Sequence, residues 1–439
     1  MTKGKNKRLF VSILMMLLGL TTISPGAFTA QASAAPAAAP AAATTTIRFA
    51  TYGAIDGWEE LFAEFSARHP EIKVEYQIFT YAEYIDKMMT MMAGGNPPDV
   101  ILTWAQYKPT WVAMGLLHDL TSRWEQSSVI KQTRFYPFIL EGIKYNGKIW
   151  GVPYDFNSKM WFHHLDAMAE AGLNPPTDDW DIYTLRSYAQ KLTSPEKRMY
   201  GTNNPFVTYP SQIQWIYNWT GHEWLDETRT KVLVDEPQVV EAFNFWNEMR
   251  NVLHVTPGYP GAYTARGDTF TGGYAMWEGW LSYAPAYINT FNYNWGVTLM
   301  PKAPSGQAGF AQGHLFSIPI GAKNIEAAWT LLEWIGSYEG QKAFIVHRDR
   351  QPSGPYPELW DLFFAGVGPE RAPKLKQWVA VTFYGADLAR VFNYWDTYPE
   401  VTTIMTQATN NIMSRGASVR NELINAASQI RALLADTSR

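Results

Sequence analysis

Aromatic rings that lie close to carboxylates and amides are the residues of this sequence best suited to form a functional site. Tryptophan, tyrosine and phenylalanine supply 15% of the 439 residues, while charged residues supply only 17%. Part of this aromatic excess must fill hydrophobic cores. The remaining rings can stack on the apolar C–H faces of a sugar, whose hydroxyls donate hydrogen bonds to neighbouring carboxylates. The composition therefore favours a protein that either binds carbohydrates or catalyses a reaction on them.

Several of these residues come directly after predicted strands. Tyr52 and Asp56 follow the first strand, Tyr81 follows the second, and Trp104 follows the third. In sheets built from strands that alternate with helices, ligands bind beyond the carboxyl ends of the strands. We therefore predict that these four side chains contact a ligand.

Later in the chain, two short strands carry polar and aromatic residues at a spacing of two. Asp155 and Asn157 share one face of their strand, and Glu278 and Trp280 share one face of the strand YAMWEGW, which leaves Trp277 for the core. These four residues are also predicted ligand contacts. As an alternative, Asp155 and Glu278 could form the carboxylate pair of a glycosidase, which requires a defined separation across the scissile bond.

Trp395 lies in a third cluster, between Tyr394 and Asp396. A ring next to a carboxylate again suits a sugar, and Trp395 is included among the predicted ligand contacts. The sequence around Trp395 has no pattern that shows whether this side chain lies in the ligand site or in the hydrophobic core. Both positions remain open.

Motifs for other chemistries are incomplete. The glycine and lysine spacing at 142–148 is that of a phosphate-binding loop, but Ile149 replaces the Ser or Thr that would hold magnesium, so we predict a turn. His163 and His164 have no metal-binding pattern around them. Cysteine is absent from the sequence, which excludes disulfides and thiolate metal sites. We expect no metal and no cofactor.

The elements that must position these residues alternate between strands and helices. Alternating apolar residues predict strands at 47–51, 72–77 and 99–103, and a helical period predicts helices at 53–69 and 84–92. This order predicts an α/β fold in which a mostly parallel sheet is flanked by helices.

The first residues have the pattern of an export signal. A basic segment is followed by the apolar run 9–20 and by small residues around Ala32 and Ala34. Because a spanning helix needs roughly 20 apolar residues, we predict a cleaved signal peptide at 1–34, followed by an Ala/Pro-rich flexible segment at 35–46. The protein is then exported, periplasmic or extracellular, and the lack of cysteine predicts no lipid anchor.

Length and charge narrow the class further. Residues 47–439 exceed the size that one hydrophobic core usually supports, so two domains are expected. The formal net charge is −4 and becomes more negative when the basic signal segment is removed. Without clustered cations, nucleic acid is not an expected partner.

Ordered sequence runs also resemble a known family. The region 58–121 contains HPEIKVEY, YAEYIDKMM, AGGNPPDVILTW and MGLLHDLT, and the middle contains YNGKIWGVPYDFNSKMWFHHLDAMAEAGLNPP and YAMWEGW. Together with WGVTLMPKAPSG and the segments that follow to about 352, they resemble extracellular solute-binding protein family 1, which includes maltose-binding proteins. At Gly313 the family often has paired glycines, and Gln312 departs from that pattern.

The resemblance implies a two-lobed periplasmic-binding-protein fold with hinge crossings and a ligand held between the lobes. It places 47–152 and 298–340 in lobe 1, places 153–297 and 341–439 in lobe 2, and adds Gly313 to the ligand contacts. A return crossing is expected at 295–299. The implied function is delivery of a carbohydrate, an oligosaccharide, to an ABC import permease by a monomeric protein that is not an enzyme.

Two alternatives stay open from the sequence. A secreted glycoside hydrolase or lyase would have the same export signal and aromatic content. The same fold could instead bind ferric iron, a polyamine or glycerol phosphate. The absence of a Tyr-Tyr pair disfavours iron, and the acidic and aromatic candidate loops disfavour a phosphate ester.

Overall fold

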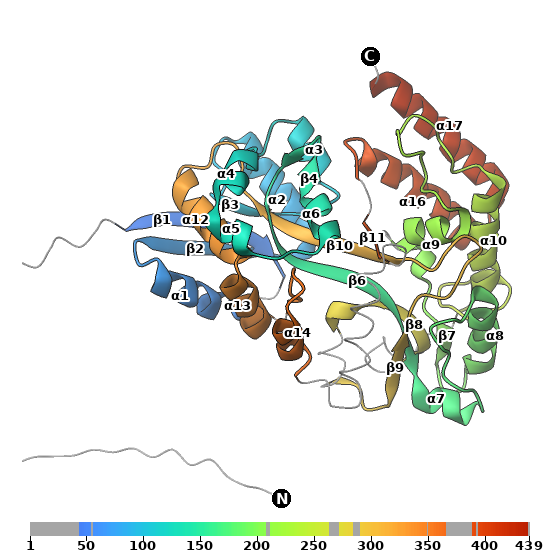
Figure 1. The fold of residues 1–439 in the computed structure, drawn as a ribbon. Helices are drawn as coiled ribbons and strands as arrows, with labels where there is room; N and C mark the ends of the chain where they lie inside the picture. Colours follow the sequence, from blue (N-terminus) through green and yellow to red (C-terminus); the bar gives the residue numbers. More distant parts are fainter. Residues whose placement is uncertain are drawn as a thin grey trace, which may run out of the picture. The chain divides into compact units, whose positions relative to one another are not determined.

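The structure is a computed structural model that describes residues 44–53, 56–207, 211–262, 272–283, 290–348, 350–365, 389–391 and 394–437 (Figure 1). The predicted signal peptide and most of the Ala/Pro-rich segment lie outside these ranges. Within them, every helix is too short or too polar to cross a membrane.

The N-terminal strands form a parallel group, as the alternating pattern predicts. Strand β1 (Thr45–Tyr52) pairs in parallel with β2 (Ile72–Phe79) on one side and with β3 (Val100–Thr103) on the other. Helices α1 (Trp58–Arg68) and α2 (Tyr81–Ala93) connect these strands. Parallel strands need such crossover helices, and both helices bury an apolar face against the sheet.

Two long strands link this group to the rest of the chain. Strand β6 (Val152–His164) pairs antiparallel with β10 (Gly309–Ser317), and β10 also pairs antiparallel with β3. The far end of β6 pairs with β8 (Tyr274–Trp280) and β9 (Trp295–Thr298). Figure 1 shows β6 and β10 running from the β1–β3 group toward the β7–β9 group.

Among the described residues, the main path of the sheet has the strand order β2-β1-β3-β10-β6-β8-β7, where β7 (Tyr200–Thr202) pairs in parallel with β8. Strand β11 (Ala389–Val391) pairs with β10 beside this path. Strands β1, β2 and β3 are parallel in lobe 1, and β7 and β8 are parallel in lobe 2. Strand β6 pairs antiparallel with β8, β9 and β10, because it carries the chain out of the first group and β10 returns it.

Three hydrophobic cores surround these strands. The first, which defines lobe 1, takes residues from 47–154 and 315–344, including α12 (Ile325–Gly336) and part of α13 (Tyr338–Arg348). The second and third lie on the two faces of β6 and β8 and define lobe 2. In β6, Trp161 belongs to one face while Met160 and Phe162 belong to the other, as a period of two requires.

Lobe 2 contains most of the remaining helices. They are α7 (Leu165–Glu170), α8 (Ile182–Leu192), α9 (Ser211–Thr220), α10 (Pro237–Asn251), α14 (Pro357–Phe363), α16 (Tyr398–Arg415) and α17 (Val419–Thr437). The short helices α3 (Lys108–Ala113), α4 (Thr121–Gln126), α5 (Ser128–Gln132) and α6 (Pro137–Ile143) and the hairpin of β4 (Lys144–Tyr145) and β5 (Lys148–Ile149) lie between β3 and β6 in the sequence.

The return crossing differs from the predicted one. The segment 295–299 forms β9, whose residues Trp295, Val297 and Leu299 pack in a core of lobe 2. Strand β10 makes the return instead, because it pairs with β3 of lobe 1. Helix α13 contributes Phe344 to the lobe 1 core and Ile345 to a lobe 2 core. The sequence pattern could not separate β9 from β10, since a strand pattern does not show which other strand a segment pairs with.

Candidate functional site

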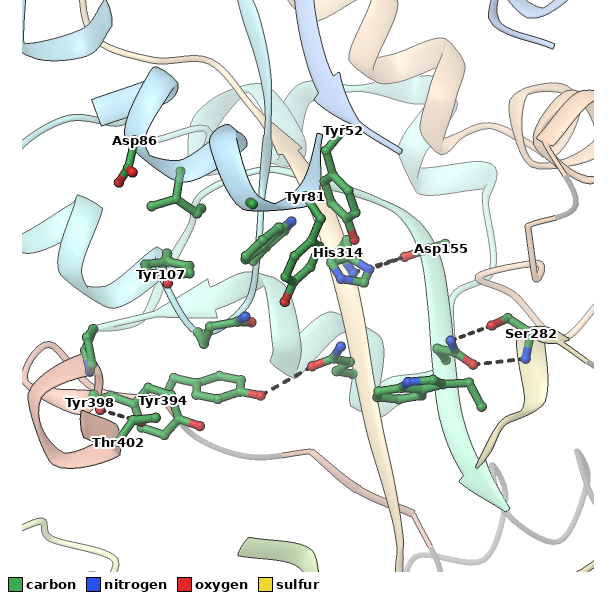
Figure 2. A pocket seen from close by; sticks show the side chains of 18 of the residues that line it. Tyr52, Tyr81, Asp86, Tyr107, Asp155, Ser282, His314, Tyr394, Tyr398 and Thr402 are labelled. Atoms are coloured by element: carbon green, nitrogen blue, oxygen red, sulfur yellow. Dashed lines mark hydrogen bonds and ion pairs between the residues drawn. The ribbon is translucent and has the colours of Figure 1, made fainter. Parts of the chain in front are cut away.

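A cavity of about 730 Å³ lies where the two lobes and the crossing strands meet (Figure 2). Such a volume is within the range of small-molecule binding sites. The lining residues come from widely separated parts of the chain: Tyr52, Tyr81, Ala82, Ile85, Asp86, Trp104, Gln106, Tyr107, Asp155, Asn157, Trp280, Ser282, Gln312, His314, Arg350, Tyr394, Tyr398, Pro399, Thr402 and Thr403.

The lobe 1 wall is aromatic. Tyr81 stacks on Trp104 with ring centroids 4.7 Å apart, and the Tyr52 ring meets Trp104 edge-on at 5.1 Å. Behind them, the buried Tyr84 hydroxyl donates to the Leu102 carbonyl, 2.6 Å away. Each ring lies at a strand end or in the first turn of the following helix. The rings are close together because these strands end at the same edge of the sheet.

Trp104 keeps a free donor at this wall. Its ring is only 4% exposed, and its indole Nε1 finds no hydrogen-bond partner among the described residues. A buried donor of this kind is costly to leave unpaired, and here it belongs to a residue that lines the cavity.

The opposite wall is formed by Trp280, at the end of β8, and by the start of α16. Tyr394 packs edge-on against Tyr398 at 4.6 Å, and Figure 2 shows both on the α16 side, across from Tyr52 and Tyr81. Thr402 lies one helical turn beyond Tyr398, which places both on the same side of α16. The cavity thus has aromatic rings on two sides.

Tyrosine hydroxyls at both walls remain protonated at neutral pH. Burial raises the pKa of Tyr81. Burial raises the pKa of Tyr107 as well, with smaller contributions from Tyr81 and Asp86, and burial also raises the pKa of Tyr394. These three side chains can therefore both donate and accept hydrogen bonds.

The crossing strands contribute a charged cluster between the walls. Asp155 on β6 accepts a hydrogen bond from the His314 backbone N–H at 3.2 Å, and its Oδ1 lies 2.9 Å from His314 Nδ1. Arg350 lies 4.0 Å from the other carboxylate oxygen. Burial would raise the pKa of Asp155, but the charge and hydrogen bonds of His314 together with the charge of Arg350 lower it below its ordinary value.

Asn157, two residues further along β6, holds the segment after Trp280. Its amide nitrogen donates to Ser282 Oγ at 2.7 Å, and its amide oxygen accepts from the Ser282 backbone N–H at 3.1 Å. Nearby, the Tyr394 hydroxyl lies 3.4 Å from Gln312 Oε1. Both contacts join segments that are more than 80 residues apart in the sequence.

Six of the residues predicted from the sequence line the cavity: Tyr52, Tyr81, Trp104, Asp155, Asn157 and Trp280. The structure brings them together from both lobes. That each of them touches a ligand stays a prediction, because their position in the wall does not by itself define a contact.

The other four predicted residues are not among the described lining residues. Asp56 is exposed in the turn before α1. Gly313 lies between two lining residues on the other face of β10, where an added Cβ would be 3.2 Å from the Asp155 carbonyl oxygen. Trp395 is 6% exposed in a lobe 2 core, beneath the Arg229 guanidinium.

Glu278 is buried within lobe 2 instead of facing the cavity. Its carboxylate contacts Lys159 Nζ at 3.0 Å and accepts hydrogen bonds from Ser211 Oγ at 2.6 Å and Trp215 Nε1 at 3.0 Å. The predicted parity on β8 is correct, since Glu278 and Trp280 share a face, but only the last residue of the strand reaches the cavity. The alternative of a glycosidase pair formed by Asp155 and Glu278 finds no support in this placement.

Sequence reasoning missed the lining residues on β10 and at the start of α16. His314 and Gln312 alternate along β10, and this period of two was a usable signal. Arg350 and Thr402 carried no signal, because only the folding of distant segments brings them to the cavity. Among the described residues, no group of three or more His, Asp or Glu side chains is arranged to hold a metal ion.

Sequence comparison identifies the family. Residues 60–353 match the pattern of a bacterial extracellular solute-binding protein. A binding protein of Brucella abortus (strain 2308) is 24% identical over 297 residues, which cover 65% of this chain and 70% of that protein.

Solved structures share the fold over nearly the whole chain. An ABC substrate-binding protein from Listeria monocytogenes in complex with cycloalternan has a TM-score of 0.80 at 19% identity, covering 89% of this chain and 99% of that one. The maltose-bound MalE3 of T. maritima has a TM-score of 0.72 at 20% identity, covering 88% and 99%. The predicted two-lobed α/β fold is therefore confirmed, as is the predicted resemblance, and the chain belongs to the family of bacterial extracellular solute-binding proteins.

Proposed function

We propose that this protein captures a carbohydrate, an oligosaccharide, in the cavity between its lobes and delivers it to an ABC import permease. The observation that carries the proposal is the pair of aromatic walls, with Tyr81 and Trp104 on one side and Trp280 and Tyr394 on the other. Sugar rings have two apolar faces, and facing aromatic walls can cover both of them.

Polar groups at the edges of these walls suit hydroxyl groups. Asp86 offers a carboxylate and Gln106 offers an amide. Trp104 Nε1 and Gln106 Oε1 are buried atoms without a partner among the described residues. Arg350 is the only lysine or arginine among the described lining residues, and it faces Asp155. This balance favours a neutral polyhydroxylated ligand over a phosphate ester.

The names of similar proteins support the same class of ligand. Besides the structures with cycloalternan and maltose, an arabinooligosaccharide-binding protein of Bacillus subtilis (strain 168) is 24% identical over 219 residues, 47% of each chain. The family is one of transport proteins and not of enzymes, which favours capture over hydrolysis.

Binding is coupled to delivery through lobe closure. A ligand that touches Tyr81 of lobe 1 and Trp280 of lobe 2 binds the closed arrangement more tightly than the open one, so it shifts the population toward closure. A permease can then distinguish loaded from empty protein. The same proposal includes export of the protein by its signal peptide, without a lipid anchor. It also includes a monomeric state and no binding of nucleic acid.

A thermal-shift screen against mono- and oligosaccharides tests the ligand class. A saccharide present at a hundred times its dissociation constant should stabilise the folded state by about 2.7 kcal/mol, because it binds only the folded chain. Calorimetric titration should then give a single saturable site, and chromatography of the mixture should recover the saccharide intact.

Other outcomes would contradict the proposal. If no saccharide raises the melting temperature while a polyamine, a ferric complex or a phosphate ester does, the protein binds a different solute. Release of shorter sugars at catalytic rates would indicate an enzyme. Light scattering and N-terminal sequencing of the exported protein test the monomeric state and the signal cleavage.

A further inference from the structure

Trp280 has a charged side chain behind its ring. The Nζ of Lys159 lies 4.3 Å from the centre of the Trp280 ring, and the two residues are register partners on β6 and β8. A cation at this distance is attracted to the face of an indole. Phe310 packs edge-on against the same ring at 5.8 Å. Lys159 itself is not among the described residues that line the cavity.

A buried carboxylate holds this cation in place. Lys159 Nζ is 3.0 Å from Glu278 Oε1, and the two side chains are only 10% and 0% exposed. Ser211 and Trp215 donate to the Glu278 carboxylate from α9, so the carboxylate has little freedom to rotate.

The backbone beside Glu278 is held as well. Asn203 Oδ1 accepts from the Glu278 N–H at 3.1 Å, and Asn203 Nδ2 donates to the Glu278 carbonyl at 3.2 Å. Two residues after Trp280 in the sequence, Ser282 binds both the nitrogen and the oxygen of the Asn157 side-chain amide. The residues before and after Trp280 are therefore anchored by side chains from other segments.

We propose that Lys159 and Glu278 are positioning residues that fix the Trp280 ring in the orientation the ligand needs, with Glu278 acting through Lys159. This rests on the proposed function, since it assigns how one wall of that site is built. It replaces the sequence prediction that Glu278 contacts the ligand.

The physical advantage is preorganisation. A tryptophan at a strand end can rotate about two side-chain torsions, and a ligand that must order the ring loses affinity. The cation behind the ring and Phe310 beside it select one orientation before the ligand arrives. The buried pair serves as a rigid support because moving either charge would leave the other unpaired in a dry environment.

The test removes both charges together. Replacing Lys159 alone would leave a buried carboxylate without its cation, which threatens folding. The double variant Lys159→Met/Glu278→Gln keeps the side-chain lengths, and the introduced amide oxygen can still accept a hydrogen bond from Ser211. Arg134→Met is the matched control, because it removes an exposed cation 4.8 Å from the Tyr356 ring, and neither of those residues is among the described lining residues.

The first readout needs no ligand. Protein labelled with 5-fluorotryptophan gives a fluorine signal for Trp280, assigned by its loss in Trp280→Phe. We expect the signal to move toward the shift of free 5-fluorotryptophan in the double variant, because a mobile ring averages its surroundings, and to stay in place in Arg134→Met. Calorimetry should then show about tenfold weaker saccharide binding for the double variant only.

Each result has a distinct meaning. If the Trp280 signal does not move in the double variant, the proposal is wrong. A loss of saccharide affinity without a movement of the signal would mean that the pair contacts the ligand directly. If the wild type binds no saccharide, the proposed function fails while the fluorine signal still tests the support of the ring. Should the double variant not fold, the wild-type protein still provides a test, because a Trp280 signal at the shift of free 5-fluorotryptophan would show a mobile ring and overturn the proposal.

Discussion

At the scale of single residues, Trp277 and Trp280 on β8 have opposite surroundings. Trp277 is 1% exposed and stacks on Phe162 at 5.6 Å, whereas Trp280 lines the cavity. The odd spacing between them puts the two rings on different faces of the strand. One ring therefore contributes to stability, and the other is available to a ligand.

We predict that Trp280→Ala weakens saccharide binding at least tenfold, an effect of about 1.4 kcal/mol or more, with little change in the free energy of unfolding. Trp277→Ala should instead lower the free energy of unfolding by about 3–5 kcal/mol, because it opens a cavity in the core. Calorimetric titration and urea denaturation measure the two quantities. Equal losses of affinity per folded molecule in both variants would contradict this assignment.

Asp155 provides a second prediction at this scale, through its dependence on pH. Its folded-state pKa lies below the ordinary value, so the charged carboxylate stabilises the fold above the unfolded pKa of about 4. This contribution is lost as the pH falls through the folded pKa. We expect Asp155→Asn to be less stable than the wild type at pH 7, and the difference to shrink below about pH 4.

Urea denaturation from pH 3 to pH 7 measures this difference. Glu326→Gln is the control, because Arg123 lowers the pKa of Glu326 by a hydrogen bond at the surface, away from the cavity. The free energy of unfolding of Glu326→Gln should depend on pH in a similar way, and this variant should keep its saccharide affinity. A difference for Asp155→Asn that stays constant down to pH 3 would show that its charge does not stabilise the fold.

At the scale of elements, the N-terminus of α2 positions an aromatic residue of the site. Thr80 caps the helix by accepting from the Glu83 backbone N–H at 3.3 Å, and its hydroxyl donates to the Glu83 carboxylate at 2.7 Å. The sequence Thr-x-x-Glu is that of a capping box, and here the Glu83 carboxylate binds the Thr80 hydroxyl. Tyr81 is the first residue of the helix, so the cap orients a ring that stacks on Trp104.

We predict that Thr80→Ala lowers the free energy of unfolding by about 1 kcal/mol and also weakens saccharide binding severalfold. Asp181→Ala removes the corresponding cap of α8, where Asp181 accepts from Thr184 at 2.7 Å. That variant should lose a similar amount of stability and keep its affinity. Retained affinity in Thr80→Ala would mean that the stacking on Trp104 alone orients Tyr81.

At the scale of the whole molecule, the cavity joins two lobes that are linked by β6, β10 and the segments around α13. Outside the lining residues, the Thr110 hydroxyl of α3 donates to the Asp396 carbonyl at 2.9 Å, a contact between lobe 1 and the segment before α16. A neutral hydrogen bond of this kind contributes only about 0.5–1.5 kcal/mol, so the ligand itself is expected to supply much of the attraction between the lobes.

We predict that a saturating saccharide reduces the radius of gyration in small-angle X-ray scattering and slows amide exchange in β6 and β10. At the same saccharide concentration, Trp280→Ala should show a smaller decrease in the radius of gyration and in amide exchange, because a smaller fraction of the variant has saccharide bound. An unchanged scattering curve together with tight calorimetric binding would show that the ligand binds without closure.

Much of the fold was predictable because its signals are local. The alternation at Ile47 and Phe49 and the helical period that includes Tyr84 indicated the strands and helices of lobe 1. The carboxyl ends of parallel strands meet at one edge of a sheet, so the order of elements alone was enough to group Tyr52, Tyr81 and Trp104.

The sequence by itself thus determined the α/β pattern, the aromatic residues at the strand ends and the two faces of β8. Only the tertiary structure decided that Glu278 is buried beside Lys159 within lobe 2, that Trp395 packs in a core, and that Arg350 and the start of α16 complete the cavity. The physical reason is that periodicity fixes which face of a strand or helix a residue occupies. Which neighbour covers that face depends on contacts between segments that are far apart in the sequence.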